Sequence, residues 1–408
     1  MTQPQRPQAV AGPEARNNGN LLRAVLDGDR VAAVELPAGG SHQGVEKTCE
    51  LHSYTQDLLI LERYAGLGPQ AHTWAFCRTM EELAGVEIPA RAEHIRLIVA
   101  ELERLHCHLL WLAGTAREVS YDALNMDLLS DRELVLDCLA EIGGNRVKYS
   151  VNVPGGVRRD LDEHACRRIE EMLAEVGSRI GKHGALFYKE LMLVNRLRGA
   201  GALTAGQAAA FGAVGPLARG TGLARDVRAN EPYGLYRQLT VRPAAGSGGD
   251  AYSRTMVHLD EMEASIALIR QAVAELPQGP LTVALPRRIP AGEVLCRVEA
   301  PRGELVYFLR ADGGDTPERL RVFTPREANL YTLEQIITGS YLANVPLLLT
   351  DYDFSFGSTG RAVVVYNGEE KRTVGWEELR DFSRDYYLRQ ETDGAAAGAS
   401  RGRTGKGE

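Results

Sequence analysis

The sequence predicts an α+β fold that is mainly α, with a large helical core and β-hairpins at its edge. The helical core is indicated by residues 90–113 and 252–276, where apolar side chains recur at helical spacing. The hairpins are indicated by residues 21–36 and 296–310, where two extended segments flank a glycine-containing turn. The change of pattern after residue 276 places most strands in the last third of the chain.

The helix over residues 90–113 is the strongest local signal. It begins after Pro89, which suits the start of a helix. Glu101, Glu103 and Arg104 interrupt its apolar pattern, and we expect them to form a solvated or partner-facing edge. Its apolar positions are Ile95, Ile98, Val99, Leu102, Leu105, Leu109 and Leu112.

Helix-capping residues and helix-breaking residues indicate further elements. Asp162 can cap a helix that we expect to bend or break near Gly181 and Gly184 and to end at about Leu197. Residues 215–250 contain Gly, Arg and Pro throughout and predict mainly irregular structure. The remaining expected helices cover residues 71–85, 121–142, 204–214 and 332–342, and the remaining expected strands cover residues 320–323 and 362–366.

One domain is expected over residues 20–390, because no linker or internal repeat interrupts this range. Residues 1–19 and 391–408 are poor in apolar side chains and are expected to be disordered tails. The first residues lack the apolar core of a signal peptide. The sequence has no run of about 18 apolar residues, so it predicts no membrane span.

Charge and cysteine usage exclude several classes of function. The formal net charge of −7 excludes a global basic surface for nucleic acid. No two cysteines form a CxxC pair, so we expect reduced, small apolar side chains and no metal or iron–sulfur cluster held by this chain. His106 and His108 are two residues apart on a helix, point to different faces and are not a metal pair. The six cysteines are Cys49, Cys77, Cys107, Cys138, Cys166 and Cys296.

Two glycine-containing stretches are the candidate site. The first is residues 62–68, Glu-Arg-Tyr-Ala-Gly-Leu-Gly, between an expected extended segment and a run of helices. The second is residues 353–361, Asp-Phe-Ser-Phe-Gly-Ser-Thr-Gly-Arg. Glycine allows sharp turns and close approach, and we expect the two stretches to meet as the walls of one buried site. No Walker loop, GxGxxG after a strand, HExxH or nucleophile elbow is present.

Many short phrases, in the same order, resemble the large subunit of membrane-bound, energy-converting nickel–iron hydrogenases and the homologous quinone-site subunit of respiratory complex I. The resemblance covers almost all of residues 20–370 and implies a hydrogenase large-subunit-like fold. The matching phrases are residues 42–47, Glu62-Arg63 with Gly66, and residues 80–85, 101–105, 143–146, 155–158, 212–226, 299–304, 344–346 and 353–361.

The resemblance also shows what this chain lacks. In the hydrogenase relatives, two CxxC pairs bind the nickel–iron centre. At those positions this chain has Ala65 and Gly68 in the first stretch, and Ser355 and Ser358 in the second. Nickel and low-spin iron require thiolate donors, so the resemblance implies no nickel–iron centre and no hydrogenase activity. The complex I relatives have also lost these cysteines and use the vacated cavity for the quinone headgroup.

Three residues carry the quinone hypothesis. His42 matches a histidine that hydrogen-bonds the quinone in complex I, and such a group can supply a proton; the alternative is a structural histidine in a loop. Glu118 falls where the relatives have an aspartate that pairs with that histidine; the alternative is a solvated carboxylate at a helix end. Tyr64 lies near the quinone tyrosine of complex I, although Gly66 aligns more closely; the alternative is a packed aromatic ring.

The remaining candidates are charged. Glu46 matches an acid shared across the superfamily and could serve a proton path; the alternative is a salt bridge with Lys47 or Arg63. Arg63 and Arg361 could hold Glu62 and Asp353 or polarise a substrate oxygen; the alternative is a buried structural ion pair.

The resemblance implies a peripheral-arm subunit of an oxidoreductase of the NADH–quinone type, on the cytoplasmic side of the membrane. Its expected partners are a small iron–sulfur subunit, a membrane subunit and other peripheral-arm subunits. The expected reaction is proton-coupled electron transfer to a quinone or a similar acceptor. Two alternatives stay open: a hydrogenase-related complex with another substrate, and a non-catalytic scaffold whose cavity is filled by Tyr64, Phe354 and Phe356.

Overall fold

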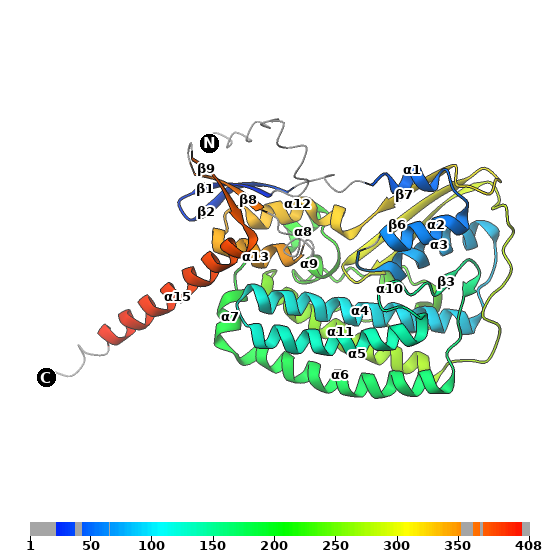
Figure 1. The fold of residues 1–408 in the computed structure, drawn as a ribbon, viewed down its shortest axis with the longest axis horizontal. Coiled ribbons are helices and arrows are strands. Elements are labelled where there is room, and N and C mark those ends of the chain that lie inside the picture. The colour runs from blue at the N-terminus through cyan, green and yellow to red at the C-terminus, as the bar shows by residue number, and fades with distance from the viewer. Residues whose placement is uncertain (1–21, 37–42, 65, 352–361, 368–369, 402–408) are drawn as a thin grey trace.

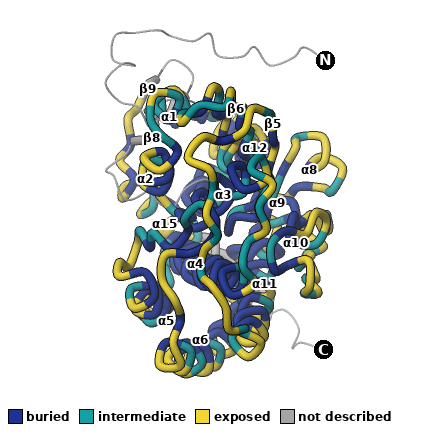
Figure 2. Tube along the Cα trace, turned by 90° about the vertical axis from the view of Figure 1, so that its right-hand side faces the viewer, coloured by how far each residue is buried: buried dark blue, intermediate teal, exposed yellow. Residues whose placement is uncertain are grey.

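Four long helices form the core of the protein. They pack as a bundle, the helical layer of the molecule, with α4 in contact with α5 and α11, and α6 in contact with both α5 and α11 (Figures 1 and 2). These helices are α4 (Ala90–Glu118), α5 (Asp122–Gly143), α6 (Glu163–Lys189) and α11 (Ala251–Ala274). The computed structural model describes residues 22–36, 43–64, 66–351, 362–367 and 370–401.

Helix α4 is buried along nearly its whole length and on all sides (Figure 2). A helix that is buried all round usually carries apolar residues at every position. This one carries Glu101, Glu103 and Arg104 with at most 1% exposure, together with the fully buried Arg96. The expectation that these charges form a solvated edge is wrong, because ion pairs and hydrogen bonds inside the core satisfy them. Glu101 pairs with Arg104 and Arg228, Arg96 pairs with Glu81, and Glu103 accepts hydrogen bonds from backbone N–H groups.

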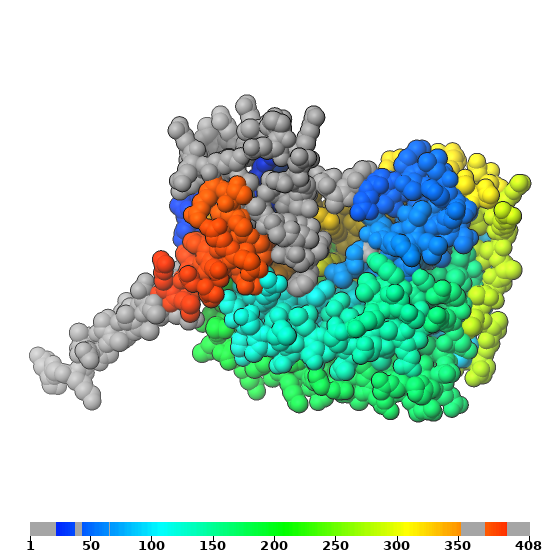
Figure 3. All heavy atoms as spheres, viewed as in Figure 1, coloured from blue at the N-terminus to red at the C-terminus, as the bar shows by residue number. Residues whose placement is uncertain are grey.

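A three-stranded antiparallel sheet covers α3 (Pro69–Ala84). Its order is β5-β6-β7, and alternate residues of β6 are buried, as expected for a sheet with one face on the core. The strands are β5 (Gly292–Ala300), β6 (Gly303–Ala311) and β7 (Arg319–Phe323). Helices α1 (Val45–Cys49) and α2 (Tyr54–Tyr64) lie beside α3 and β7, above the helical layer in Figures 1 and 3.

The two ends of the chain meet in a second sheet. Its order is β2-β1-β8-β9, and β1 pairs in parallel with β8, which lies more than three hundred residues later. The strands are β1 (Leu22–Asp27), β2 (Arg30–Glu35), β8 (Ala362–Asn367) and β9 (Glu370–Gly375). Helix α15 (Trp376–Arg401) follows β9 and leads away from the body (Figure 1).

Short elements connect these layers. They are β3 (Asn152–Val153), β4 (Gly156–Val157), α7 (Leu191–Leu197), α8 (Ala205–Phe211), α9 (Gly215–Arg219), α10 (Val227–Asn230), η2 (Gly234–Arg237), α12 (Pro325–Ile337), η3 (Leu342–Asn344), α13 (Val345–Leu348) and η4 (Leu349–Asp351). The expectation of mainly irregular structure in residues 215–250 therefore missed α9, α10 and η2.

Both predicted hairpins and the capped start of α6 are confirmed: the Asp162 side chain accepts a hydrogen bond from the Ala165 backbone N–H at 2.8 Å. The predicted break near Gly181 and Gly184 is wrong. The buried apolar face of α6 keeps the helix intact, because packing outweighs the cost of about 1 kcal/mol per interior glycine. The helix ends at Lys189 instead of about Leu197, and α7 follows at Leu191.

Three further helices differ from expectation. The first candidate stretch does not follow an extended segment, because Glu62, Arg63 and Tyr64 form the last turn of α2. Helix α12 starts at Pro325 and not near residue 332, since Thr324 and Glu327 form a capping box there. Helix α15 includes residues 391–401, which were expected to be disordered; alanine, the best helix former, is frequent in this segment.

Candidate functional site

An open cleft of about 600 Å³ brings two of the predicted site residues together. Glu46 comes from α1 and Tyr64 from the end of α2, and they share the cleft with residues of β7 and α12. The lining residues are Gln43, Val45, Glu46, Tyr64, Arg321, Val322, Phe323 and Glu327. In the sequence, Gln43 directly follows His42, and Tyr64 directly precedes Ala65.

Glu46 holds α1 against β7. Its carboxylate accepts a hydrogen bond from the Val322 backbone N–H at 2.9 Å and pairs with Arg321 at 2.5 Å. Neither predicted alternative partner is used: Lys47 pairs with Glu50 at 2.7 Å, and Arg63 lies 4.0 Å from Glu62. Glu46 is therefore both a cleft residue and a structural clamp.

Tyr64 rests on a buried pair of polar rings. Its ring packs edge-on against His72, with centroids 5.9 Å apart, and His72 Nδ1 lies 2.8 Å from the Tyr307 hydroxyl. Burial, with the nearby Lys148 charge, lowers the pKa of His72 to about 3, so this imidazole is neutral. Burial raises the pKa of Tyr64, so its hydroxyl keeps its proton and can donate a hydrogen bond into the cleft.

Gly68 stands at the start of α3, where the backbone needs a left-handed conformation (φ 90°). A Cβ placed on Gly68 would lie 3.8 Å from Pro301 and 3.9 Å from the Glu103 carboxylate. Glu103 caps α3 by accepting hydrogen bonds from the backbone N–H groups of Gln70 (2.8 Å) and Ala71 (3.2 Å). Burial raises the pKa of Glu103 to about 7 despite these bonds. The first stretch thus meets α4 and the β5–β6 hairpin tip.

The same hairpin tip reaches Asp351, the last described residue before the second stretch. Arg302 lies close enough to Asp351 to oppose the rise that burial causes in its pKa. Asp351 also pairs with the buried Arg254 at 2.8 Å. The hairpin tip therefore lies close to Gly68, which belongs to the first stretch, and to Asp351, which adjoins the second stretch. This arrangement is expected if the two stretches share one site.

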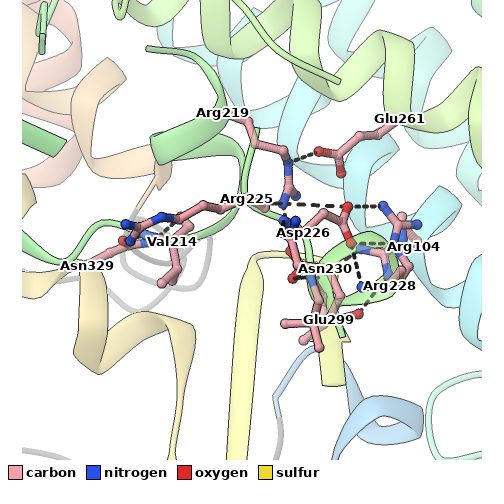
Figure 4. Close-up of polar contacts among 12 residues, drawn as sticks. Arg104, Val214, Arg219, Arg225, Asp226, Arg228, Asn230, Glu261, Glu299 and Asn329 are labelled. Carbon is pink, nitrogen blue, oxygen red and sulfur yellow. Dashed lines mark hydrogen bonds and ion pairs between the residues drawn. The ribbon is translucent and has the colours of Figure 1, made fainter. Parts of the chain in front are cut away.

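A buried ionic network holds the end of this hairpin (Figure 4). Arg104 donates to the backbone carbonyls of Glu299 (2.7 Å) and Ala300 (3.1 Å), which fixes the end of β5. Arg219 joins Glu299 (2.7 Å) to Glu261 (2.6 Å). Burial and the neighbouring Asp226 raise the pKa of Glu299 to about 7. Besides these residues, the network contains Glu101, Asp226 and Arg228.

Gly215 lets the hairpin tip approach α9. Its φ of +65° favours glycine, and a Cβ at this position would lie 2.0 Å from the Arg302 carbonyl oxygen. We expect Gly215→Ala to displace the tip and to lower the free energy of unfolding by about 1–3 kcal/mol, measured by chemical denaturation.

Gly206→Ala is the matched control for that change. Gly206 lies within α8, and a Cβ there would meet nothing within 4 Å. This control should be neutral or stabilising by about 0.5–1 kcal/mol. Equal stabilities of the two variants would show that the close approach at Gly215 is unimportant.

Glu118 ends α4 and is only 6% exposed, so the alternative of a solvated carboxylate is wrong. The helix continues beyond the predicted end at residue 113 and brings Glu118 close to the Trp376 side chain of α15. Burial raises the pKa of Glu118 to about 7, although Arg117 and Arg380 oppose the rise. Glu118 can therefore hold or release a proton near neutral pH.

This pKa predicts a pH dependence of stability. A folded-state pKa raised above the ordinary value of 4.5 favours folding at low pH, and this contribution is lost as the pH rises through about 7. We expect Glu118→Gln to be more stable than wild type at pH 8 by about 2–3 kcal/mol and to match it near pH 4. Glu163→Gln, whose side chain is 95% exposed on α6, is the control and should leave the pH profile unchanged. Parallel profiles for Glu118→Gln and wild type would contradict the assignment.

The other predicted residues divide into two groups. Arg63 is 65% exposed and so is not part of a buried ion pair, although it lies beside the buried Glu62, whose carboxylate accepts hydrogen bonds from Ser150. The second group lies outside the described residues, and the meeting of the two stretches stays a prediction. It consists of His42, Ala65, Asp353, Ser355, Ser358 and Arg361.

Sequence reasoning did not select His72, Glu103, Arg302, Tyr307 or Asp351 as site residues. Glu103 and Arg302 lie in the phrases at 101–105 and 299–304 that carry the resemblance, so a signal was present for both. His72, Tyr307 and Asp351 gave no local signal, because their partners are distant in sequence. Among the described residues, no group of three or more His, Cys, Asp and Glu side chains could hold a metal ion. No described helix is long and apolar enough to cross a membrane.

Comparison with known proteins adds the family. Residues 119–288 and 283–361 match the family model of the respiratory-chain NADH dehydrogenase 49 Kd subunit. The chain is 34% identical to the carbon monoxide-induced hydrogenase of Rhodospirillum rubrum, covering 83% of this chain and 94% of that protein. It is 32% identical to an NADH-quinone oxidoreductase subunit of Clostridium beijerinckii, covering 86% of this chain and 96% of that protein.

A solved structure agrees in fold. A chain of the membrane-bound sulfane sulfur reductase, an archaeal respiratory membrane complex, superposes with a TM-score of 0.77 and 29% identity, covering 80% of this chain and 91% of that one. The fold is therefore of the hydrogenase large-subunit type, as predicted. The chain is also 34% identical to the membrane-bound hydrogenase subunit alpha of Pyrococcus furiosus, covering 85% of this chain and 84% of that protein. The protein belongs to the family of the respiratory-chain NADH dehydrogenase 49 Kd subunit.

Proposed function

We propose that this subunit takes part in the proton-coupled reduction of a quinone or a similar two-electron acceptor, without a nickel–iron centre. Membership of the family makes it a subunit of a complex-I-like or energy-converting hydrogenase-type membrane complex. The observation that carries the finer proposal is the pair of altered stretches. Ala65, Gly68, Ser355 and Ser358 occupy the positions at which the resemblance places the four metal-binding cysteines.

The donor chemistry at these positions does not fit the metal centre. Alanine and glycine have no donor atom, and a serine hydroxyl is a poor ligand for nickel and low-spin iron. The cysteines of this chain lie elsewhere, and five of the six are buried. Burial raises the pKa of Cys107 to about 12, so this thiol near Glu103 and Arg302 stays protonated.

The polar groups around the cleft and the hairpin tip suit a quinone-like acceptor. Reduction places negative charge on carbonyl oxygens, which donors and cations stabilise. Tyr64 offers a protonated hydroxyl, Arg302 offers a fixed positive charge, and His42 is the proposed donor of a proton. Glu118, with a pKa of about 7, is proposed to assist His42.

Electrons would come singly from an iron–sulfur cluster in a small partner subunit. A membrane subunit and other peripheral-arm subunits would complete the complex, with this chain on the cytoplasmic side. The similar solved complex is named as a reductase of sulfane sulfur. Sulfane sulfur is therefore the second acceptor to test beside quinone.

The test uses the complex purified with its native partners. Wild type should reduce a soluble quinone, and His42→Ala should slow this reaction by about 10²–10⁴-fold, the usual contribution of general acid–base catalysis. His52→Ala is the control, because His52 bonds only the backbone of its own helix turn among the described residues, through Thr48. Equal rates for His42→Ala and wild type would exclude a role for His42. A wild-type complex that reduces neither acceptor would favour a scaffold.

A further inference from the structure

Two buried histidines lie next to each other at the centre of the helical layer. His108 of α4 and His258 of α11 are at most 2% exposed, and their Nδ1 atoms are 3.0 Å apart. His108 Nε2 lies 2.8 Å from the Glu261 carboxylate. Arg219 holds the other oxygen of Glu261 at 2.6 Å. The three groups Glu261, His108 and His258 thus form a continuous hydrogen-bonded chain.

The protons on this chain can be assigned. Arg219 and His108 lower the pKa of Glu261 despite its burial, so it is a carboxylate that can only accept. Burial lowers the pKa of both imidazoles, so each is neutral and carries one N–H. His108 must then donate from Nε2 to Glu261, which leaves its Nδ1 as an acceptor. His258 consequently donates from Nδ1, and its Nε2 keeps a basic lone pair.

His258 lies beside the candidate site. Its ring stacks on Trp111, with centroids 3.9 Å apart and an interplanar angle of 23°. The Trp111 side chain hydrogen-bonds Asp351, which adjoins the second stretch. Arg302 at the hairpin tip is close enough to act electrostatically on both His258 and Asp351. His258, the last residue of this hydrogen-bonded chain, is therefore near Trp111, Arg302 and Asp351, and Asp351 adjoins the candidate site.

We propose that Glu261, His108 and His258 form a proton relay, in which His258 Nε2 exchanges a proton with the oxygen of the acceptor. This inference rests on the proposed function and assigns the source of a second proton for the acceptor. His258 is the catalytic residue of the relay, whereas His108 and Glu261 are positioning residues that act through it.

Each transfer moves one proton and breaks one bond for each bond formed. When the reduced acceptor is oxidised, its O–H bond breaks and an Nε2–H bond forms on His258, while the electrons leave to the cluster of the partner subunit. In the same step, the Nδ1 proton of His258 moves to Nδ1 of His108. His108 becomes an imidazolium paired with the Glu261 carboxylate, which stabilises it at 2.8 Å. Acceptor reduction runs through the same step in reverse and begins after the relay has taken up one proton from solvent, so that His108 is an imidazolium.

The charges around His258 keep both imidazoles of the resting relay neutral. Arg219 and Arg302 oppose an imidazolium at His258, and Glu261 favours one. Electrons that arrive at the acceptor add negative charge in the same buried volume and favour proton uptake by the relay. Proton uptake is thereby tied to reduction of the site.

The test compares His258→Gln with wild type in the purified complex. Glutamine can still form hydrogen bonds but cannot carry the proton, so we expect kcat for acceptor reduction to fall by about 10²-fold with little change in KM, and the solvent deuterium isotope effect to change. His183→Gln is the matched control, because His183 is also buried against a carboxylate, Asp131, at 2.7 Å on α5 and α6, outside the relay. This control should keep the wild-type rate and isotope effect.

The outcomes separate the relay from the function on which it rests. A wild-type complex that reduces no acceptor overturns the proposed function. An active wild type, with His258→Gln as fast as His183→Gln and with an unchanged isotope effect, overturns the relay alone. If His258→Gln does not assemble, the proton inventory of wild type decides: a relay that moves two protons together gives a curved plot against deuterium content, and a straight line contradicts it.

Discussion

Arg219→Leu should lower the free energy of unfolding of the full chain by about 3–5 kcal/mol. Arg219 is fully buried and donates to Glu261 at 2.6 Å, to Glu299 at 2.7 Å and to the Arg225 carbonyl at 2.8 Å. Its loss leaves two buried carboxylates without their main cation. The effect should be smaller at pH 6 than at pH 8, because protonation of Glu299, with a pKa of about 7, removes one of those charges.

Arg225→Leu is the control for this prediction. Arg225 is exposed and stands six residues away on the same connecting segment, and it meets Arg219 through its backbone carbonyl. Substitution of an exposed side chain usually changes stability by less than about 0.5 kcal/mol. Chemical denaturation at both pH values measures the two variants. Similar losses for Arg219→Leu and Arg225→Leu would mean that the buried network does not support the fold.

Arg302→Met should slow acceptor reduction by about 10²–10³-fold in kcat, the loss typical of removing one group that stabilises developing charge. Arg302 occupies the hairpin tip between Gly68 and Asp351, and its charge acts on Asp351, Cys107 and His258. A fixed cation at this place stabilises negative charge on a reduced acceptor more than it stabilises the neutral, oxidised one. The loss should therefore appear in kcat more than in KM.

Arg310→Met tests whether any arginine of the same hairpin has this effect. Arg310 lies on β6, is 43% exposed and pairs with Glu318 at 2.9 Å. We expect the Arg310→Met substitution to leave the rate of acceptor reduction unchanged. Steady-state kinetics of the purified complex measure both variants, and an Arg302→Met complex with wild-type kcat would remove Arg302 from the site.

Elements with local signals could be predicted from the sequence. The hairpins of residues 22–35 and 292–311, the cap at Asp162 and helix α4 all follow from spacing, turns and capping chemistry. Helix α12 was misplaced although its capping box at Thr324 and Glu327 is also local. The start of this helix therefore has a local signal that lies outside the expected range of residues 332–342.

The environment of the charged residues could not be predicted in the same way. As a charged residue that interrupts the apolar pattern of α4, Glu101 was expected to be solvated. It is buried instead, in an ion pair with Arg228, which lies 127 residues away in the sequence. Glu118 similarly lies close to Trp376 of α15, which is distant in the sequence. Partners this distant in the chain leave no periodic signal near the residue itself. The resemblance supplied the family and the altered cysteine positions, and the structure supplied Glu103, Arg302, His108 and His258 as neighbours.

The central claim is that this subunit serves proton-coupled acceptor reduction without nickel. The most direct test is metal analysis of the complex purified with its native partners, combined with a quinone reduction assay on the same sample. We expect quinone reduction with no stoichiometric nickel. Nickel at one atom per subunit, with hydrogen evolution in place of quinone reduction, would contradict the claim.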